Sequence, residues 1–307
     1  MPDNDLIATA DYWDAYVERH VVEGTNTNRA EWLSHPLVQV HHATARGERS
    51  IESWVADVAL AGRPRARGVG VGAGTGSLEL GLVASSTVDR FDLLDISSGA
   101  LELARTTAAE LGIAQRIRTV TGDIGEFDLG SGRYDIATCM GSLHHVARLD
   151  SVLAAVARSL ADDGVLVAYE YVGPDRFATG SVERGLAQQL YRAIDPALRS
   201  PNPELPLPDP QAVIEADPTE AVHSSEILAT LGRHFDEVSV VHHGGALAYT
   251  TWWGLDHDAL HETTEGWGFV DVLLQADLAL TTTGVLDDYF VTILATGPRR
   301  EPDTGRR

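Results

Sequence analysis

Five short apolar runs alternate with segments of helical periodicity across the first half of the chain. The runs predict buried strands at residues 66–71, 88–96, 117–120, 134–140 and 165–170, and helices are expected at residues 77–83, 98–111 and 149–160. Strands that alternate with helices in this way form a parallel sheet. Ligands of such sheets bind beyond the carboxyl ends of the strands, so the loops after these runs are expected to surround one cleft.

The first of these loops is rich in glycine. The run Gly-Val-Gly-Ala-Gly-Thr-Gly at residues 70–76 leads into the first expected helix. Gly72, Gly74 and Gly76 lack the Cβ atoms that hinder positive φ angles and close backbone approach, and the helix start offers unpaired N–H groups. A nucleotide-like cofactor fits such a turn. The motif alone does not separate NAD, FAD and S-adenosylmethionine (SAM) from a tight turn without a ligand.

An acidic residue ends the second apolar run. Asp95 follows the glycines by about 20 positions, the spacing of a carboxylate that accepts hydrogen bonds from the hydroxyls of a ribose. The alternative is that Asp95 only begins the helix at residues 98–111, a role that Ser97 can also fill. A further acidic residue, Asp123, follows the run at residues 117–120.

The ordered motifs GVGVGAGTG, LLDIS, GDI, YDIATCMGSLHHV and LADDGVLVAYEY resemble those of class I SAM-dependent methyltransferases, closely over residues 66–172 and more loosely elsewhere. The resemblance implies an α/β, Rossmann-like fold: a seven-stranded, mostly parallel sheet with a C-terminal antiparallel hairpin, a helical N-terminal cap and a C-terminal lid insertion. It also implies SAM as cofactor, with the glycine loop under the methionine part, Asp95 on the ribose and Asp123 at the adenine. The implied cofactor-binding residues are Gly72, Ala73, Gly74, Gly76, Asp95, Ile96, Asp123, Ile124, Met140 and Gly141.

One residue departs from the pattern of that family. Gly70 stands where the family often has an acidic residue that anchors the methionine amino group, which puts this contact in question. NAD binding is the main alternative, but it has no need of Asp123 and predicts a parallel pattern throughout. Two β-like runs at residues 237–243 and 289–296 resemble instead the terminal antiparallel hairpin of the methyltransferase sheet.

The chain divides into four predicted segments: a helical cap at residues 1–60, the SAM-binding core at 61–172, a helical and proline-rich lid at 173–235, and hairpin strands with an intervening helical segment at 236–307. Within the lid, helices are expected at residues 177–194 and 224–231, the second capped at Ser224. The prolines at residues 200–210 exclude a regular helix or a central strand, and this stretch is expected to form a loop over the site.

Candidate catalytic residues follow the fourth and fifth strands. His144 and His145 come after the fourth strand, and Glu170 ends the fifth, so a histidine and a carboxylate are expected to meet. In similar small-molecule O-methyltransferases, a histidine in the place of His145 with an acid near Glu170 serves as a base that removes a hydroxyl proton. The alternative is that one imidazole only hydrogen-bonds to the backbone.

Composition narrows the classes of partner. The formal net charge is −22 and every basic side chain is arginine, which argues against partners held by many phosphate contacts, so no nucleic acid is expected. No apolar run approaches the length of a membrane span. Cys139, the single cysteine, lies in an expected buried strand and favours packing over nucleophilic chemistry. No metal site is expected, because the adjacent His41 and His42 would diverge on a helix and no acidic cluster completes a site.

The function expected is therefore transfer of a methyl group from SAM to a hydroxyl, or an amine, of a small metabolite such as a natural product or sugar. Two alternatives stay open: a protein that binds SAM without methyl transfer and catalyses a cyclisation or rearrangement, and a regulatory partner of another enzyme. The sequence indicates a cytoplasmic protein and allows a homodimer.

Overall fold

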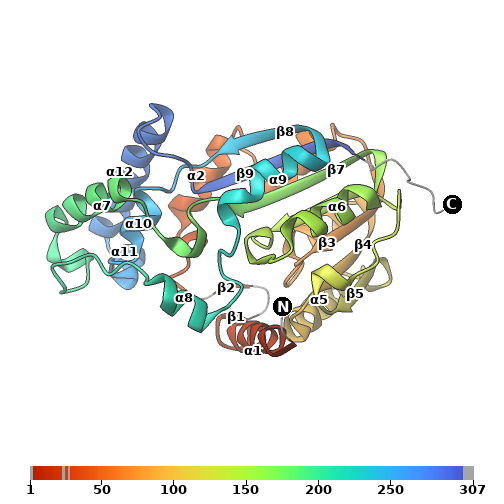
Figure 1. The fold of residues 1–307 in the computed structure, drawn as a ribbon, viewed down its shortest axis with the longest axis horizontal. Coiled ribbons are helices and arrows are strands. Elements are labelled where there is room, and N and C mark those ends of the chain that lie inside the picture. Colours follow the sequence, from red (N-terminus) through yellow and green to blue (C-terminus); the bar gives the residue numbers. More distant parts are fainter. Residues whose placement is uncertain (1–2, 23–24, 27, 300–307) are drawn as a thin grey trace.

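The computed structural model describes residues 3–22, 25–26 and 28–299, and its centre is a seven-stranded sheet (Figure 1). The sheet has the strand order β5-β4-β3-β6-β7-β9-β8. Its strands are β3 (Arg65–Val71), β4 (Val88–Asp95), β5 (Ile117–Thr121), β6 (Tyr134–Met140), β7 (Leu160–Tyr171), β8 (Phe235–His242) and β9 (Phe290–Pro298).

Neighbouring strands from β5 to β7 are parallel, whereas β9 is antiparallel to both β7 and β8. The predicted mostly parallel sheet with a terminal antiparallel hairpin is thus confirmed. The hairpin strands begin and end within two residues of their expected bounds.

Helices cover both faces of the sheet. One face packs against α3 (Ile51–Trp54), α4 (Ser77–Ala84) and α5 (Ser98–Glu110), and the other against α6 (Leu149–Ser159) and α9 (Ile227–His234). Ser97 caps α5 by accepting the N–H of Ala100 at 3.0 Å. The central strands β3, β4, β6 and β7 are largely buried on both faces, which is why they read as continuous apolar runs in the sequence.

A second group of helices forms a lobe at one end of the sheet, at the left of Figure 1. It comprises α2 (Pro36–Ala45), α7 (Ser181–Ala193), α10 (Ala248–Trp252), α11 (His257–Glu262) and α12 (Thr264–Thr282), packed around a shared apolar cluster. Buried Asp277 of α12 fixes the chain before α10 by accepting N–H groups of Gly245, Leu247 and Ala248. We call this group the helical lobe.

The segment at residues 173–235 differs from its prediction. The helix expected from residue 177 begins at Ser181, because Arg176 and Phe177 adopt left-handed angles with φ of 54°. The helix expected at residues 224–231 is α9, which begins at Ile227 after a short 3-10 turn, Ser224–Glu226. The Ser224 hydroxyl donates to the Gly173 carbonyl and does not cap this helix. A short helix, α8 (Pro210–Ala216), lies between α7 and α9.

The proline-rich stretch is a loop, but it does not cover the cavity described below. It packs on α7, where the Tyr191 hydroxyl contacts the carbonyls of Ser200 and Asn202 at 3.1 Å. Gln188 also accepts the Leu205 N–H at 2.9 Å. The loop therefore completes the helical lobe. The boundaries at residues 60, 172 and 235 remain predictions.

Among the described residues before the core, the main element is α1 (Asp3–His20), which is followed by the short antiparallel pair β1 (Val21–Val22) and β2 (Thr25–Asn26). None of the described helices is both long enough and apolar enough to cross a membrane. Cys139 lies fully buried in β6, and burial raises the pKa of its thiol well above the ordinary value, as suits a packing residue.

Candidate functional site

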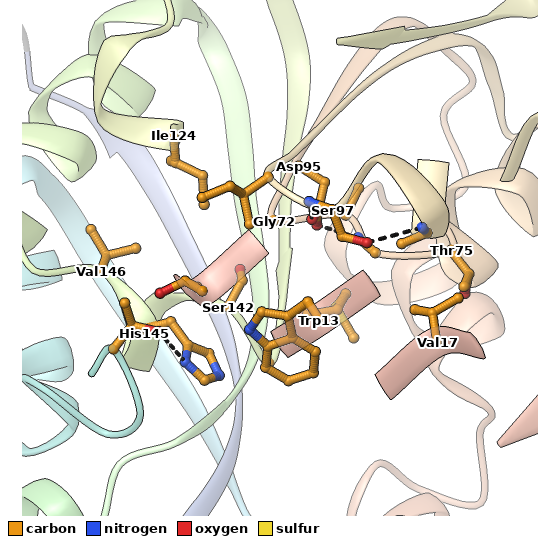
Figure 2. Close-up of a pocket in the computed structure, with 18 of the residues that line it drawn as sticks. Trp13, Val17, Gly72, Thr75, Asp95, Ser97, Ile124, Ser142, His145 and Val146 are labelled. Carbon is orange, nitrogen blue, oxygen red and sulfur yellow. Dashed lines mark hydrogen bonds between the residues drawn. The ribbon is translucent and has the colours of Figure 1, made fainter. Parts of the chain in front are cut away.

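A cavity of about 480 Å³ opens at the carboxyl ends of β3, β4 and β6. Loops after these strands form its floor, and α1 lines it from the other side. In Figure 2, Trp13 lies between His145 on one side and Thr75 with Val17 on the other. The cleft predicted from the order of strands and helices is present. Its volume lies within the range of small-molecule sites.

The glycine loop brings backbone against this cavity. Gly72, Ala73 and Gly74 line it, and all three glycines of the loop have positive φ angles, between 54° and 68°. A Cβ at Gly72 would lie 2.4 Å from Cβ of Ser142, whereas a Cβ at Gly74 would meet nothing within 4 Å. Gly72 thus lets two loops pack, and Gly74 leaves room for a ligand.

Gly76 has a different place from the other glycines of the loop. It precedes α4 and packs under Leu93, where a Cβ would lie 2.8 Å from a Leu93 methyl carbon. It does not line the cavity. Its requirement for glycine comes from the turn into α4 and not from the cleft.

Asp95 holds the glycine loop to the end of β4. One carboxylate oxygen accepts the Gly74 N–H at 2.7 Å and the other accepts the Ser97 N–H at 2.8 Å. Burial raises the pKa of Asp95, and these N–H groups oppose the shift. The Ile96 N–H also interacts with this carboxylate, which keeps capacity for a further hydrogen bond from a ligand in the cavity that it lines together with Ile96.

The remaining expected cofactor residues lie along the same cavity. Asp123, Ile124, Met140 and Gly141 all line it. Asp123 accepts the Gly125 N–H at 2.9 Å, and its other oxygen lies 3.5 Å from the guanidinium of Arg148. Nine of the ten expected cofactor-binding residues therefore line one cavity. The tenth, Gly76, lies next to it in the turn that leads into α4.

Helix α1 forms the cover of the cavity. Thr9, Trp13, Tyr16 and Val17 line it from this helix. Asp14, on the same helix, accepts the Ser97 hydroxyl at 2.6 Å and the Gly99 N–H at 2.9 Å, so it adds a carboxylate to the N-terminus of α5. The sequence predicted a helical cap at residues 1–60, but nothing in the local pattern pointed to Asp14.

Glu79 is a cavity residue that sequence reasoning missed. It projects from α4, lines the cavity and is only 2% exposed. Its Oε1 accepts the Thr138 hydroxyl at 2.5 Å, and burial raises the pKa of its carboxyl. This oxygen would lie 3.1 Å from a Cβ at Gly70. A carboxylate is therefore present in the region where Gly70 lacks one.

The structure corrects the expected pair of His145 and Glu170. Glu170 is fully buried and pairs with His144, whose Nδ1 lies 2.8 Å from Oε2. Its other oxygen accepts the N–H groups of Ser142 and Leu143 at 2.9 and 2.8 Å. Neither Glu170 nor His144 lines the cavity, so Glu170 holds the loop after β6 in place. The pattern gave the right region but not the partner. The two rings lie side by side with centroids 4.2 Å apart, and it is Nδ1 of His144 that faces Glu170.

His145 is the histidine that faces the cavity. Its ring stands edge-on to Trp13 with centroids 5.2 Å apart, and its Nδ1 lies 3.2 Å from the Thr219 hydroxyl (Figure 2). Burial and the neighbouring His144 lower the pKa of His145 to about 3, so its imidazole is neutral at pH 7. For His144, burial lowers the pKa, but the contact with Glu170 outweighs burial and raises it above the ordinary value.

An acidic segment that sequence reasoning did not single out for chemistry completes this region. Asp217 is buried and accepts the Thr219 hydroxyl at 2.7 Å. Glu220 lies 3.6 Å from Nε2 of His144 and 3.9 Å from Nε2 of His145, and burial raises the pKa of its carboxyl. Arg176 donates to the Glu220 carbonyl at 2.7 Å. Elsewhere, Nε2 of His41 lies 3.1 Å from the His243 carbonyl oxygen, and the His42 ring lies beside that of His243 with centroids 4.4 Å apart.

Sheet order, terminal hairpin and glycine-loop cleft together define the class I methyltransferase fold. In agreement, residues 69–166 match a family model described as a methyltransferase domain. An uncharacterized protein of a Synechococcus strain is 31% identical over 94 residues, which make up 31% of this chain and 22% of that relative. The match thus spans about a fifth of the relative's length.

Two solved structures share the fold over most of this chain. One is the geranyl diphosphate C-methyltransferase of Streptomyces coelicolor, with a TM-score of 0.55 and 13% identity, covering 97% of this chain and 100% of that one. The other is phosphoethanolamine N-methyltransferase 2 of Haemonchus contortus, with a TM-score of 0.53 and 11% identity, covering 94% and 60%. Both were crystallised with S-adenosylhomocysteine. At these identities the likeness shows the fold alone.

Proposed function

We propose that the protein is a SAM-dependent methyltransferase that transfers a methyl group to a hydroxyl, or an amine, of a small metabolite. One observation carries the proposal: the glycine loop, Asp95, Asp123 and Met140 line a single cavity at the carboxyl ends of the strands. This is the position in which sheets of this topology bind nucleotide-like ligands. The match of residues 69–166 to the methyltransferase domain supports it.

The residues present fit SAM. Space beside Gly74 admits a ligand against the backbone, and the remaining acceptor capacity of Asp95 suits a ribose hydroxyl. Glu79 is a buried carboxylate whose only side-chain hydrogen-bond partner among the described residues is the Thr138 hydroxyl. We assign it to the ammonium group of the methionine part, the contact that Gly70 cannot make. When bound, SAM supplies an electrophilic methyl group on a positively charged sulfur.

The acceptor is assigned to the side of the cavity at His145 and Trp13. The protein's main contribution there is to align the nucleophile with the methyl group and to exclude water, to which the apolar residues that α1 places along the cavity contribute. For a hydroxyl acceptor, His145 is the imidazole that faces the cavity and is our candidate for taking the proton as the bond forms; its lowered pKa makes the free ring a weak base. His144 and Glu170 position the loop that carries it. The buried carboxylates nearby favour a neutral or cationic acceptor over a polyanion, and a natural product or sugar stays the expected class.

Label transfer tests the proposal. The protein would be incubated with methyl-labelled SAM and a panel of hydroxylated and amino-bearing metabolites, and label and S-adenosylhomocysteine would be followed by mass spectrometry. Methyl transfer predicts one labelled acceptor for each S-adenosylhomocysteine released. Substrate conversion without release would support the alternative in which SAM is bound but not consumed. No SAM binding by calorimetry would contradict both.

Assembly and location remain predictions of this proposal. A homodimer would show as twice the monomer mass in size-exclusion chromatography with light scattering. The expected cytoplasmic location and the absence of a nucleic-acid partner rest on sequence composition.

A further inference from the structure

Two imidazoles and a carboxylate converge beside the cavity. Nε2 of His144 lies 3.6 Å from Oε1 of Glu220, and Nε2 of His145 lies 3.9 Å from Oε2. One ligand atom from each of the three side chains lies within 4.8 Å of the others. Their distances therefore place three donor atoms of metal-binding type around one point.

The hydrogen bonds on the far side of each ring determine which nitrogen carries a lone pair. Nδ1 of His144 faces a carboxylate oxygen of Glu170 at 2.8 Å, so in the neutral ring Nδ1 carries the proton. The Thr219 hydroxyl donates to Asp217 at 2.7 Å and can then only accept from Nδ1 of His145 at 3.2 Å. Both Nε2 atoms are thus left as acceptors that face the acidic group of Glu220.

Three acceptors that face one another are stabilised by a proton or a metal ion between them. Histidines that bind metals through Nε2 commonly donate Nδ1–H to a carboxylate or another acceptor, and here Glu170 and Thr219 supply that second interaction. The local charges point the same way. Glu170, Asp217 and Glu220 carry three acidic groups, whereas Arg176 is the one guanidinium bonded to this segment among the described residues.

One acceptor in this region has no donor. Oδ2 of Asp217 is buried without a hydrogen-bond partner in the described part of the chain, and it lies 3.5 Å from Nδ1 of His145. A buried acceptor without a donor is costly, and positive charge on or beside the His145 ring reduces that cost. A cation bound at Nε2 of His145 places positive charge beside this ring and so stabilises Oδ2 of Asp217.

We propose that His144, His145 and Glu220 bind a divalent transition-metal ion, such as Zn²⁺, Mn²⁺ or Fe²⁺. Two imidazoles and one carboxylate suit this class of ion. An ion at about 2.0–2.2 Å from each donor atom needs these atoms about 3.0–3.4 Å apart. The separations of 3.6 and 3.9 Å, which reach different oxygens of the Glu220 carboxylate, must therefore shorten on binding, and the three side chains must shift toward one another. Three protein ligands leave open positions on the ion, and His145 and Thr219 line the cavity, so small molecules there can reach it.

The site departs from the sequence expectation of no metal, because Glu220 lies far along the chain from the two histidines. Metal binding here does not depend on the proposed methyl transfer. In the metal-bound protein both Nε2 lone pairs are occupied, so His145 acts as a ligand and not as the proton acceptor proposed for the metal-free protein. The second group of three candidate ligands, Asp175, His223 and Glu226, includes an exposed glutamate and offers a matched control.

Metal titration of the purified full-length chain tests the proposal. After removal of metals with a chelator, Zn²⁺ would be titrated by calorimetry, and Co²⁺ would report imidazole coordination through its visible absorption. We expect one equivalent to bind tightly. Glu220→Gln and His145→Gln should each weaken binding at least 100-fold, and Thr219→Val about 10-fold or more through loss of the second interaction. Glu226→Gln should leave binding unchanged.

Two results would overturn the proposal: no stoichiometric binding, or one equivalent that persists in Glu220→Gln and His145→Gln but is lost in Glu226→Gln. Thermal melting and SAM affinity of each variant show that the chain is folded, so loss of metal is not mistaken for unfolding. Metal binding is read without SAM or acceptor. A failure of the methyltransferase proposal would therefore appear separately, as absent SAM binding with intact Zn²⁺ binding.

Discussion

The carboxylate of Glu79 lies beside the backbone of Gly70, with Oε1 3.1 Å from the place where a Cβ of residue 70 would be. The side chain of Glu79 on α4 thus occupies the space that a side chain at position 70 on β3 would need. The departure from the family pattern at Gly70 does not leave the cavity without a carboxylate; the acid comes from a neighbouring element.

Glu79→Gln should weaken SAM binding about 10- to 100-fold, because a buried charge-assisted contact is replaced by a neutral one. Calorimetry measures the affinity. Methylthioadenosine lacks the amino-acid part of SAM, and its affinity should change little. Glu102→Gln on the exposed face of α5 serves as the matched control. Equal losses for both ligands would remove the assignment of Glu79 to the ammonium group.

The same variant should stabilise the ligand-free protein at neutral pH. Burial raises the pKa of Glu79 above its ordinary value, so the folded state holds this proton more tightly than the unfolded state. The resulting stability is present below pH of about 4.5 and is lost as pH rises through the folded pKa. The free energy of unfolding of Glu79→Gln relative to wild type should therefore rise across that window, by at most about 1.4 kcal/mol per pH unit, and then level off. Denaturant titrations across this pH range would measure it, and parallel profiles would contradict the prediction.

Asp14→Ala should loosen the cover of the cavity. The variant removes the contacts of α1 with Ser97 and Gly99 at the start of α5, at a cost of about 1 kcal/mol. We expect a several-fold faster release of SAM, measured by stopped-flow tryptophan fluorescence, with little change in melting temperature. Asp11→Ala, at an exposed position of the same helix, should behave like wild type.

Glu170→Ala should destabilise the protein by about 3–5 kcal/mol. It leaves two buried N–H groups and the Nδ1 of His144 without an acceptor. Glu170→Gln keeps one acceptor for the backbone and should cost less. Chemical denaturation of both variants tests this, and a stable Glu170→Ala protein that has lost only turnover would support the sequence expectation that Glu170 acts in catalysis.

The parts predicted well are those set by local pattern. The glycine loop follows β3 directly and Asp95 ends β4, so the pattern of apolar residues was enough to predict both the sheet and the position of the cleft. Glu79 escaped notice because it reads as an ordinary polar position of a short helix. The role of Glu79 depends on its place beside Gly70, which has no side chain. That relationship joins two separate elements, α4 and β3, and a local pattern does not show it.

Long-range packing explains the other differences. Prolines at residues 200–210 predict a loop, but only Tyr191 and Gln188 on α7 decide that it lies on the helical lobe. Similarly, His145 meets Thr219 and not Glu170, since the segment around Asp217 folds back beside the loop after β6. No periodicity in either segment encodes that approach.

The place of β9 between β7 and β8 has a consequence for how the chain folds. Tyr171 pairs with Phe290, so the interior of the sheet closes only after the intervening lid and helical lobe have been synthesised. Contacts between residues so distant in sequence form slowly, because a long loop must be ordered first. Until β9 pairs with it, β7 has an unpaired edge that can pair with strands of other chains. Production of this protein should therefore be limited by aggregation of partly synthesised chains.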